Sequence, residues 1–272
     1  VVIDAFEESC WPELCELSIG GPAGADQDLA TILRVLPSRR LASFDWSNDL
    51  LGPLTYNCLR EVHFDHLQSL IIGECTGVTS AMVQEVLTSC VHLDIFDAPY
   101  IFVRDIATAP KPWGCLKLEN LAIYIAKQEE DEVEWDGLVF RQISRLGRLQ
   151  SLDLRRSPHI YDDPVRSDAI LQLDTLDFCL PSSFSIKSSS ENGSNDSSSV
   201  SGGDIRCWSS LIQMRQFSFD GDRQMLGIQE ALWMTEHWRD LWCICGKFRG
   251  VESDDVDNLE KFFEEKGISY FD

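Results

Sequence analysis

Short groups of apolar residues recur along the chain at intervals that suit a strand, a turn and a helix. The stretch LQSLIIGEC (67–75) has apolar residues at its first, fourth and sixth positions and a small residue three positions later. Single matches are common in a sequence that is 44% hydrophobic, so the regular spacing indicates the repeat. The middle residues of successive matches lie 23 to 31 residues apart, with one interval of 41. The nine matches are Leu14-Leu17-Ile19, Leu41-Phe44-Trp46, Leu67-Leu70-Ile72, Cys90-Leu93-Ile95, Leu118-Leu121-Ile123, Leu149-Leu152-Leu154, Leu173-Leu176-Phe178, Met214-Phe217-Phe219 and Trp238-Leu241-Cys243.

Apolar residues with the periodicity of a helix occupy four of the segments between these groups. Such stripes predict amphipathic helices that pack against the strands. Gly147 and Gly267 follow two of the stripes, and each is expected to end its helix in the left-handed conformation. Residues 58–66, CLREVHFDH, alternate instead with a period of two, as a strand does. The stripes are Leu29-Ile32-Leu33-Leu36, Val83-Val86-Leu87-Cys90, Val139-Ile143-Leu146 and Val256-Leu259-Phe263.

The stretch LQSLIIGECTGVTSAMVQEVLTSCVHLDIF resembles the cysteine-containing class of leucine-rich repeat, with Cys75 as the turn cysteine. PWGCLKLENLAIYI, LGRLQSLDLRR and EALWMTEHWRDLWCICGKF are similar to fungal F-box and leucine-rich-repeat proteins. The resemblance implies an α/β leucine-rich-repeat solenoid, with parallel strands on its concave face and helices on its convex face. Residues 1–272 would form this single domain from about nine irregular repeats, and the final GISYFD would cap it.

The interval of 41 residues contains a serine-rich stretch at 182–203. Its few apolar side chains cannot bury enough surface to offset the entropy of ordering, so we expect a disordered insertion. A tolerated surface loop is one interpretation, and a segment that accepts phosphates is another. The chain also begins without methionine, and it contains no F-box, which precedes the repeats in the related family. We therefore expect it to be part of a longer protein.

The formal charge of −22 repels phosphate backbones, so the sequence argues against nucleic acid and favours a basic protein partner. No apolar run is long enough to span a bilayer, and the first residues do not resemble a signal peptide. We expect no membrane association and a cytoplasmic or nuclear location. In that setting the ten cysteines are expected to be reduced, buried thiols.

The sequence lacks the common motifs of enzymes and cofactor sites. We therefore expect no catalytic, cofactor-binding or metal-binding residues. Cys58, His63 and His66 have a weak metal-ligand character, but no fourth ligand is evident. Cys243 and Cys245 are separated by one residue, so on a strand both would point to the same face, toward the core.

If the strands stack in parallel, the residues between the buried ones point into the concave face. Exposed aromatic side chains beside charges are typical of binding hot spots, and a row of aspartates at 94, 153 and 177 would select a basic segment. The alternative is that these are ordinary solvated strand residues, with the aromatic rings covering a neighbouring repeat. The predicted partner-binding residues are Asp94, Phe96, Tyr124, Asp153, Arg155, Asp177 and Trp242.

One basic cluster runs against the overall charge, within residues 141–156. It follows the acidic run EEDEVEWD, so it indicates a charge-compensated surface or, alternatively, a dock for an acidic or phosphorylated segment. Its members are Arg141, Arg145, Arg148, Arg155 and Arg156.

The family resemblance implies a substrate-binding leucine-rich-repeat region of an F-box-type ubiquitin-ligase receptor. The ligase subunits would dock through a region outside this chain, and the concave face would hold the protein substrate. Two alternatives remain: a scaffold or inhibitor of the same fold without a ubiquitin role, and an enzyme whose site the sequence does not reveal.

Overall fold

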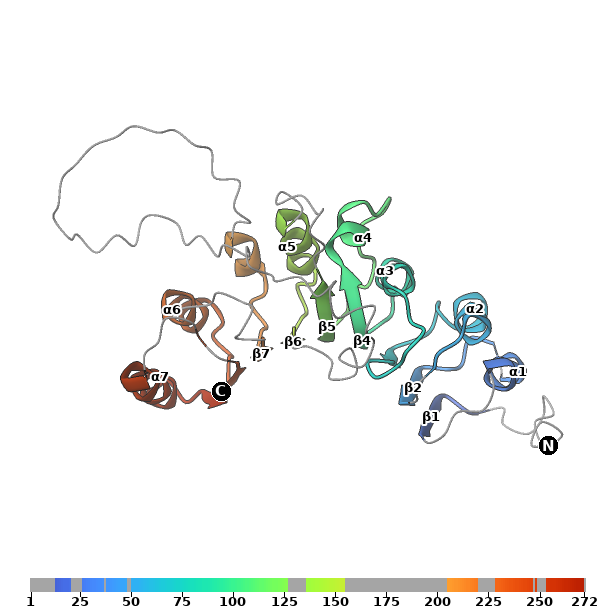
Figure 1. The fold of residues 1–272 in the computed structure, drawn as a ribbon, viewed down its shortest axis with the longest axis horizontal. Helices are drawn as coiled ribbons and strands as arrows, with labels where there is room; N and C mark the ends of the chain where they lie inside the picture. The colour runs from blue at the N-terminus through green and yellow to red at the C-terminus, as the bar shows by residue number, and fades with distance from the viewer. Residues whose placement is uncertain are drawn as a thin grey trace.

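The chain forms an α/β structure around one parallel β-sheet (Figure 1). The computed structural model describes residues 13–20, 26–36, 38–47, 50–126, 136–154, 205–219, 228–246, 248 and 253–271. Within these residues, nine strands pair in chain order, each parallel to the next. The strands are β1 (Glu16–Gly20), β2 (Ser43–Ser47), β3 (Ser69–Ile71), β4 (Ile95–Phe102), β5 (Asn120–Ala126), β6 (Ser151–Asp153), β7 (Gln216–Ser218), β8 (Cys243–Cys245) and β9 (Ser269–Phe271).

Helices connect the strands and lie along one side of the sheet, with the strands on the inner side of a curved array (Figure 1). None of the helices in the described residues is both long and apolar enough to cross a membrane. They are α1 (Asp26–Val35), α2 (Pro53–Val62), α3 (Ser80–Ser89), α4 (Val103–Ala107), α5 (Asp136–Ser144), the short 3-10 helix η5 (Ile205–Ser210), α6 (Ile228–His237) and α7 (Ser253–Glu265).

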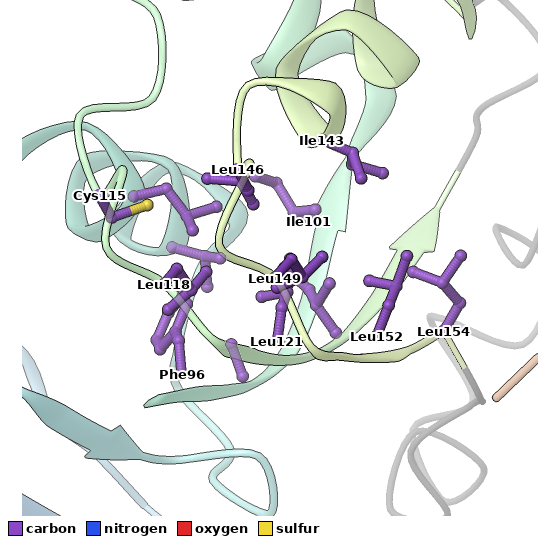
Figure 2. Close-up of a cluster of buried hydrophobic side chains, with 14 of the residues drawn as sticks. Phe96, Ile101, Cys115, Leu118, Leu121, Ile143, Leu146, Leu149, Leu152 and Leu154 are labelled. Carbon is purple, nitrogen blue, oxygen red and sulfur yellow. The ribbon is translucent and has the colours of Figure 1, made fainter. Parts of the chain in front are cut away.

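The hydrophobic core lies between the sheet and the helices. The predicted triplets supply it on β2, β3, β5, β6 and β7, where the middle residue of each triplet is at most 1% exposed and aligns with its neighbour's, as Phe44 does with Leu70 and Leu121 with Leu152. Figure 2 shows how leucines of β5, β6 and the turns before them meet Ile143 of α5 in one buried cluster. Each strand therefore buries its apolar side chains only with the help of its neighbours and its helix.

The sequence-based register is wrong by three residues on two strands. Phe96 of β4 aligns with Leu70, whereas the triplet predicted Leu93 at that position; on β8, Ile244 aligns with Phe217 in place of Leu241. At β4 the apolar template fits twice, three residues apart, whereas at β8 the second register has Gly246 at its last position. The registers that are formed bury Phe96 and Ile244 to 1% and 0% exposure. A shift by an odd number exchanges the two faces of a strand.

Two local predictions are also wrong. Residues 58–62 belong to helix α2 rather than to a strand, because Cys58 and Leu59 face the core one turn after Thr55 and Tyr56. Pro53 suits the first turn of this helix because its missing N–H would have no partner there. Gly147 does not adopt the left-handed conformation, whereas Gly267 does, with a φ of 73°.

The remaining predictions about the repeat concern the segment between β6 and β7 and the C-terminal residues. The triplet at 173–178 and the insertion at 182–203 lie outside the described residues. In the sheet, β6 pairs directly with β7. The final GISYFD, expected as a cap, contains β9, which continues the sheet beside β8.

Burial should set the order in which the cysteines react. Burial raises the pKa of Cys115 to about 12 and pushes the pKa values of Cys58 and Cys90 upward as well. Because the thiolate is the nucleophile, iodoacetamide should label Cys15, which is exposed, and Cys245, which is partly exposed, well before the buried thiols. The buried cysteines in the described residues are Cys58, Cys75, Cys90, Cys115 and Cys243.

The measurement is mass spectrometry of tryptic peptides after timed labelling, with a urea-unfolded sample as the control in which all cysteines react. Labelling of Cys90 or Cys115 as fast as Cys15 would contradict the packing of the helices on the sheet.

Candidate partner-binding surface

Three aspartates lie on the face of the sheet that turns away from the helices, which we call the open face. The pairing register aligns Asp45 of β2 with Ile71, Ile71 with Asp97 of β4, Asp97 with Ala122, and Ala122 with Asp153 of β6. We call Asp45, Asp97 and Asp153 the acidic row. Because neighbouring strands are about 4.8 Å apart, successive carboxylates of the row are separated by about 10 Å.

The first member of the row has only part of its hydrogen-bonding capacity filled. Ser18 Oγ donates to Asp45 Oδ2 at 3.0 Å. The other oxygen, Asp45 Oδ1, is buried and has no hydrogen-bond partner within the described part of the chain. A buried carboxylate oxygen without a donor is costly, so it favours a ligand that brings an N–H or a cation to this position.

The second member is held in an unfavourable electrostatic environment. Burial, followed by the charges of Asp153, Glu74 and Asp45, raises the pKa of Asp97 from 3.8 to about 6. The carboxylate lies directly over Gly73, where a Cβ would clash with it. At neutral pH, the open face therefore holds a partly buried negative charge that no described cation offsets at close range.

These features suit a positively charged side chain more than a metal ion. Among the described residues, no group of three or more histidine, cysteine, aspartate or glutamate side chains could hold a metal ion. Carboxylates spaced at about 10 Å can instead each meet a separate lysine or arginine of an extended peptide.

Two of the predicted binding residues are buried and cannot serve as exposed anchors. Phe96 is 1% exposed and packs in the core with Leu118 and Leu121 (Figure 2), because the three-residue register shift turns it toward the helices. Tyr124 does face away from the main core, but it is 3% exposed in a separate cluster with Tyr100. This cluster forms because β4 and β5 are longer than the other strands.

The structure places one residue of the predicted aspartate row on the open face and another outside the strand. Asp153 lies on β6 on the open face, as expected. Asp94 precedes β4, and the register shift places Asp97 in the row in its stead. Asp177 and Arg155 lie outside the described residues.

At β8 the shift also exchanges the expected faces. Ile244 is the buried core residue, whereas Cys243 and Cys245 flank it on the other face with their Sγ atoms 3.7 Å apart. The prediction that both cysteines face the core is therefore wrong. Trp242 comes just before the strand and is 53% exposed, so it remains available to a partner at this end of the sheet.

The weak metal candidates have a structural explanation. His63 is completely buried at the end of α2, and its Nε2 lies 3.0 Å from the carbonyl oxygen of Leu33. Burial lowers the pKa of His63, so it is a neutral core residue. His66 instead lies near the surface and stacks with His92.

Comparison with known proteins adds no family to this picture. No protein-family model matches the chain, and no curated protein matches it.

Sequence reasoning missed Asp45 and Asp97 as members of one row. The available signal was an aspartate one residue after the aligned core residue of β2, β4 and β6, at positions 45, 97 and 153. That signal appears only when the register of β4 is correct.

Proposed function

We propose that this chain is a protein-recognition module and that its acidic row binds a basic segment of a protein partner. The observation that supports this most directly is that two features lie on the same face of the sheet. Asp45 Oδ1 is buried without a hydrogen-bond partner among the described residues, and the pKa of Asp97 is raised because its charge is unfavourable there. A bound lysine or arginine would donate to the first carboxylate and offset the charge of the second.

The broader assignment follows the sequence resemblance. We propose that the chain is a leucine-rich-repeat solenoid and that it forms the substrate-binding part of an F-box-type ubiquitin-ligase receptor. The sequential parallel sheet, with helices on one side, supports the solenoid. In such a receptor the module would act by proximity, holding the substrate where other subunits transfer ubiquitin.

Binding of a labelled six-lysine peptide, measured by fluorescence anisotropy, tests the acidic row. The double variant Asp97→Asn and Asp153→Asn should weaken binding about tenfold or more, because it removes two of the three carboxylates. The control double variant, Glu260→Gln with Glu264→Gln, removes the same number of charges from exposed acids on α7 and should leave binding nearly unchanged. Equal effects of the two changes would show that the peptide senses only net charge, and would contradict the site.

The receptor role needs a separate test. The full-length natural protein, affinity-purified from its source cells, should carry cullin-type ligase subunits with it. Their consistent absence would contradict the receptor role but leave the acidic row untouched.

A further inference from the structure

A row of basic side chains borders the sheet at the edge where the strands begin. An unbroken series of backbone hydrogen bonds, 2.7 to 2.8 Å long, connects the residue before each strand to its counterpart on the preceding strand, from Ala42 to Gln150. The residue two positions before each of these is basic on five consecutive strands, β2 to β6. We call this set the basic ladder; it consists of Arg40, His66, His92, Lys117 and Arg148.

The turns that lead into β4, β5 and β6 place their basic residues identically. Each turn is closed by a hydrogen bond from the N–H of a leucine to a carbonyl oxygen three residues earlier, at 3.2 Å for Leu93, 3.0 Å for Leu118 and 2.9 Å for Leu149. His92, Lys117 and Arg148 immediately precede these leucines and occupy the third position of their turns. The alignment of the ladder is therefore a property of the backbone rather than of flexible side chains.

The members of the ladder contact one another and a few acids. The rings of His66 and His92 stack with centroids 6.5 Å apart, and Lys117 Nζ lies 3.1 Å from His92 Nδ1. Glutamates pair with the two ends: Glu13 with Arg40 at 2.7 Å and Glu119 with Arg148 at 3.2 Å. Asp65 and Asp94 are the other acids next to the ladder in sequence.

The size and charge of the ladder define what could bind there. Five strands at about 4.8 Å apart span about 19 Å, which is the length of about six residues of extended peptide. The rest of a chain with a net charge of −22 repels anions, and charges beyond the screening length of about 8 Å have little effect at physiological salt. A short acidic segment can thus bind within the ladder, whereas a long nucleic-acid backbone would extend over acidic surface.

We propose that the basic ladder is a second docking surface, which binds an extended segment of about six residues, rich in aspartate and glutamate, on a protein partner. It is distinct from the acidic row and does not depend on it. Carboxylates of the segment accept hydrogen bonds from Lys117 and the arginines, and they add negative charge beside the histidine pair. A partner that uses both surfaces would be oriented on the sheet by its own charge distribution.

Fluorescence anisotropy with a labelled six-glutamate peptide tests this proposal, at low ionic strength and again at about 0.15 M salt. Lys117→Glu should weaken binding about fivefold or more, since reversal replaces an attraction with a repulsion. The matched control is Lys261→Glu on α7, an identical change at another exposed lysine, which should alter binding by less than about twofold. Arg148→Gln, the second test position, should weaken binding in the same direction.

Each other outcome would overturn the proposal. Absence of binding to the unaltered protein at low ionic strength, or equal losses in Lys117→Glu and Lys261→Glu, would show that the ladder is not a site. Equal or stronger binding of an oligonucleotide of the same charge would show a general affinity for anions. The six-lysine peptide separates this proposal from the acidic row, because Lys117→Glu should not weaken its binding, whereas Asp97→Asn with Asp153→Asn should.

Discussion

Replacing Phe96 with alanine is expected to lower the free energy of unfolding by about 3–5 kcal/mol, the usual loss for a buried phenylalanine. Phe96 is 1% exposed, and its ring lies in the cluster that includes Leu118 and Leu121. The cavity left by the substitution would open between β4 and its neighbours. Urea unfolding followed by circular dichroism measures the change.

The matched control is Ile95→Ala, at the preceding residue of the same strand. Ile95 is 39% exposed and points to the other face, so its removal should cost less than about 1 kcal/mol. If the two variants were reversed in their effects, β4 would have the register that the sequence suggested first, and the acidic row would lose its central member.

The Asp97→Asn variant is expected to be more stable than the unaltered protein at pH 8 and nearly equal to it at pH 4. The pKa of Asp97 rises from 3.8 to about 6 on folding. The penalty is therefore small at pH 4 and absent well below it, where the carboxyl is protonated in both states. As the pH rises through 6, the folded state bears the full cost of the charge. Asparagine removes that cost, which is about 2 kcal/mol after allowance for solvent screening.

Thermal or urea unfolding at several pH values measures this difference. Asp94→Asn is the control, and it should change the free energy of unfolding by less than about 0.5 kcal/mol at either pH. A stability gain in Asp97→Asn that was equal at pH 4 and pH 8 would show that the charge of Asp97 is not its source. Together with weaker binding of the lysine peptide, a gain confined to high pH would mean that Asp97 is retained for recognition at the expense of stability.

The sequence predicted the strands best where leucine fixes a single register. Around Leu70 and Leu152 the template does not fit again three residues later, and these strands form where expected; around Leu121 it fits again at Leu121-Tyr124-Ala126, but the first register is the one that forms. In CVHLDIFDA the template fits at two positions, three residues apart, and at β8 the register that forms replaces the full match Trp238-Leu241-Cys243 with Leu241 and Ile244 followed by Gly246. Only pairing with the neighbouring strand decides between the two registers, and that information is not local.

The residues of the candidate site could not be predicted fully from the sequence for the same reason, because they depend on the strand register. Whether Asp94 or Asp97 belongs to the acidic row depends entirely on the register of β4. The sequence analysis found one member of the basic ladder, Arg148, as part of the arginine cluster at 141–156, but that cluster was defined by closeness in the sequence. The ladder follows spatial proximity, which joins Arg148 to Lys117 and His92 rather than to Arg141.

The direct pairing of β6 with β7 makes the joint between them unlike the others in the sheet. The chain between Asp153 and Gln216 is far longer than that between any other two neighbouring strands, and each doubling of a connection costs about 0.6 kcal/mol in closure entropy. Across this joint, the described residues are held together by backbone hydrogen bonds, such as that from Leu154 N–H to the carbonyl oxygen of Ser218 at 2.8 Å, and by side-chain contacts, such as that between Phe140 of α5 and Trp208 of η5. Because this pairing closes the longest connection in the sheet, we expect its formation to carry the largest closure entropy of the eight described strand pairings.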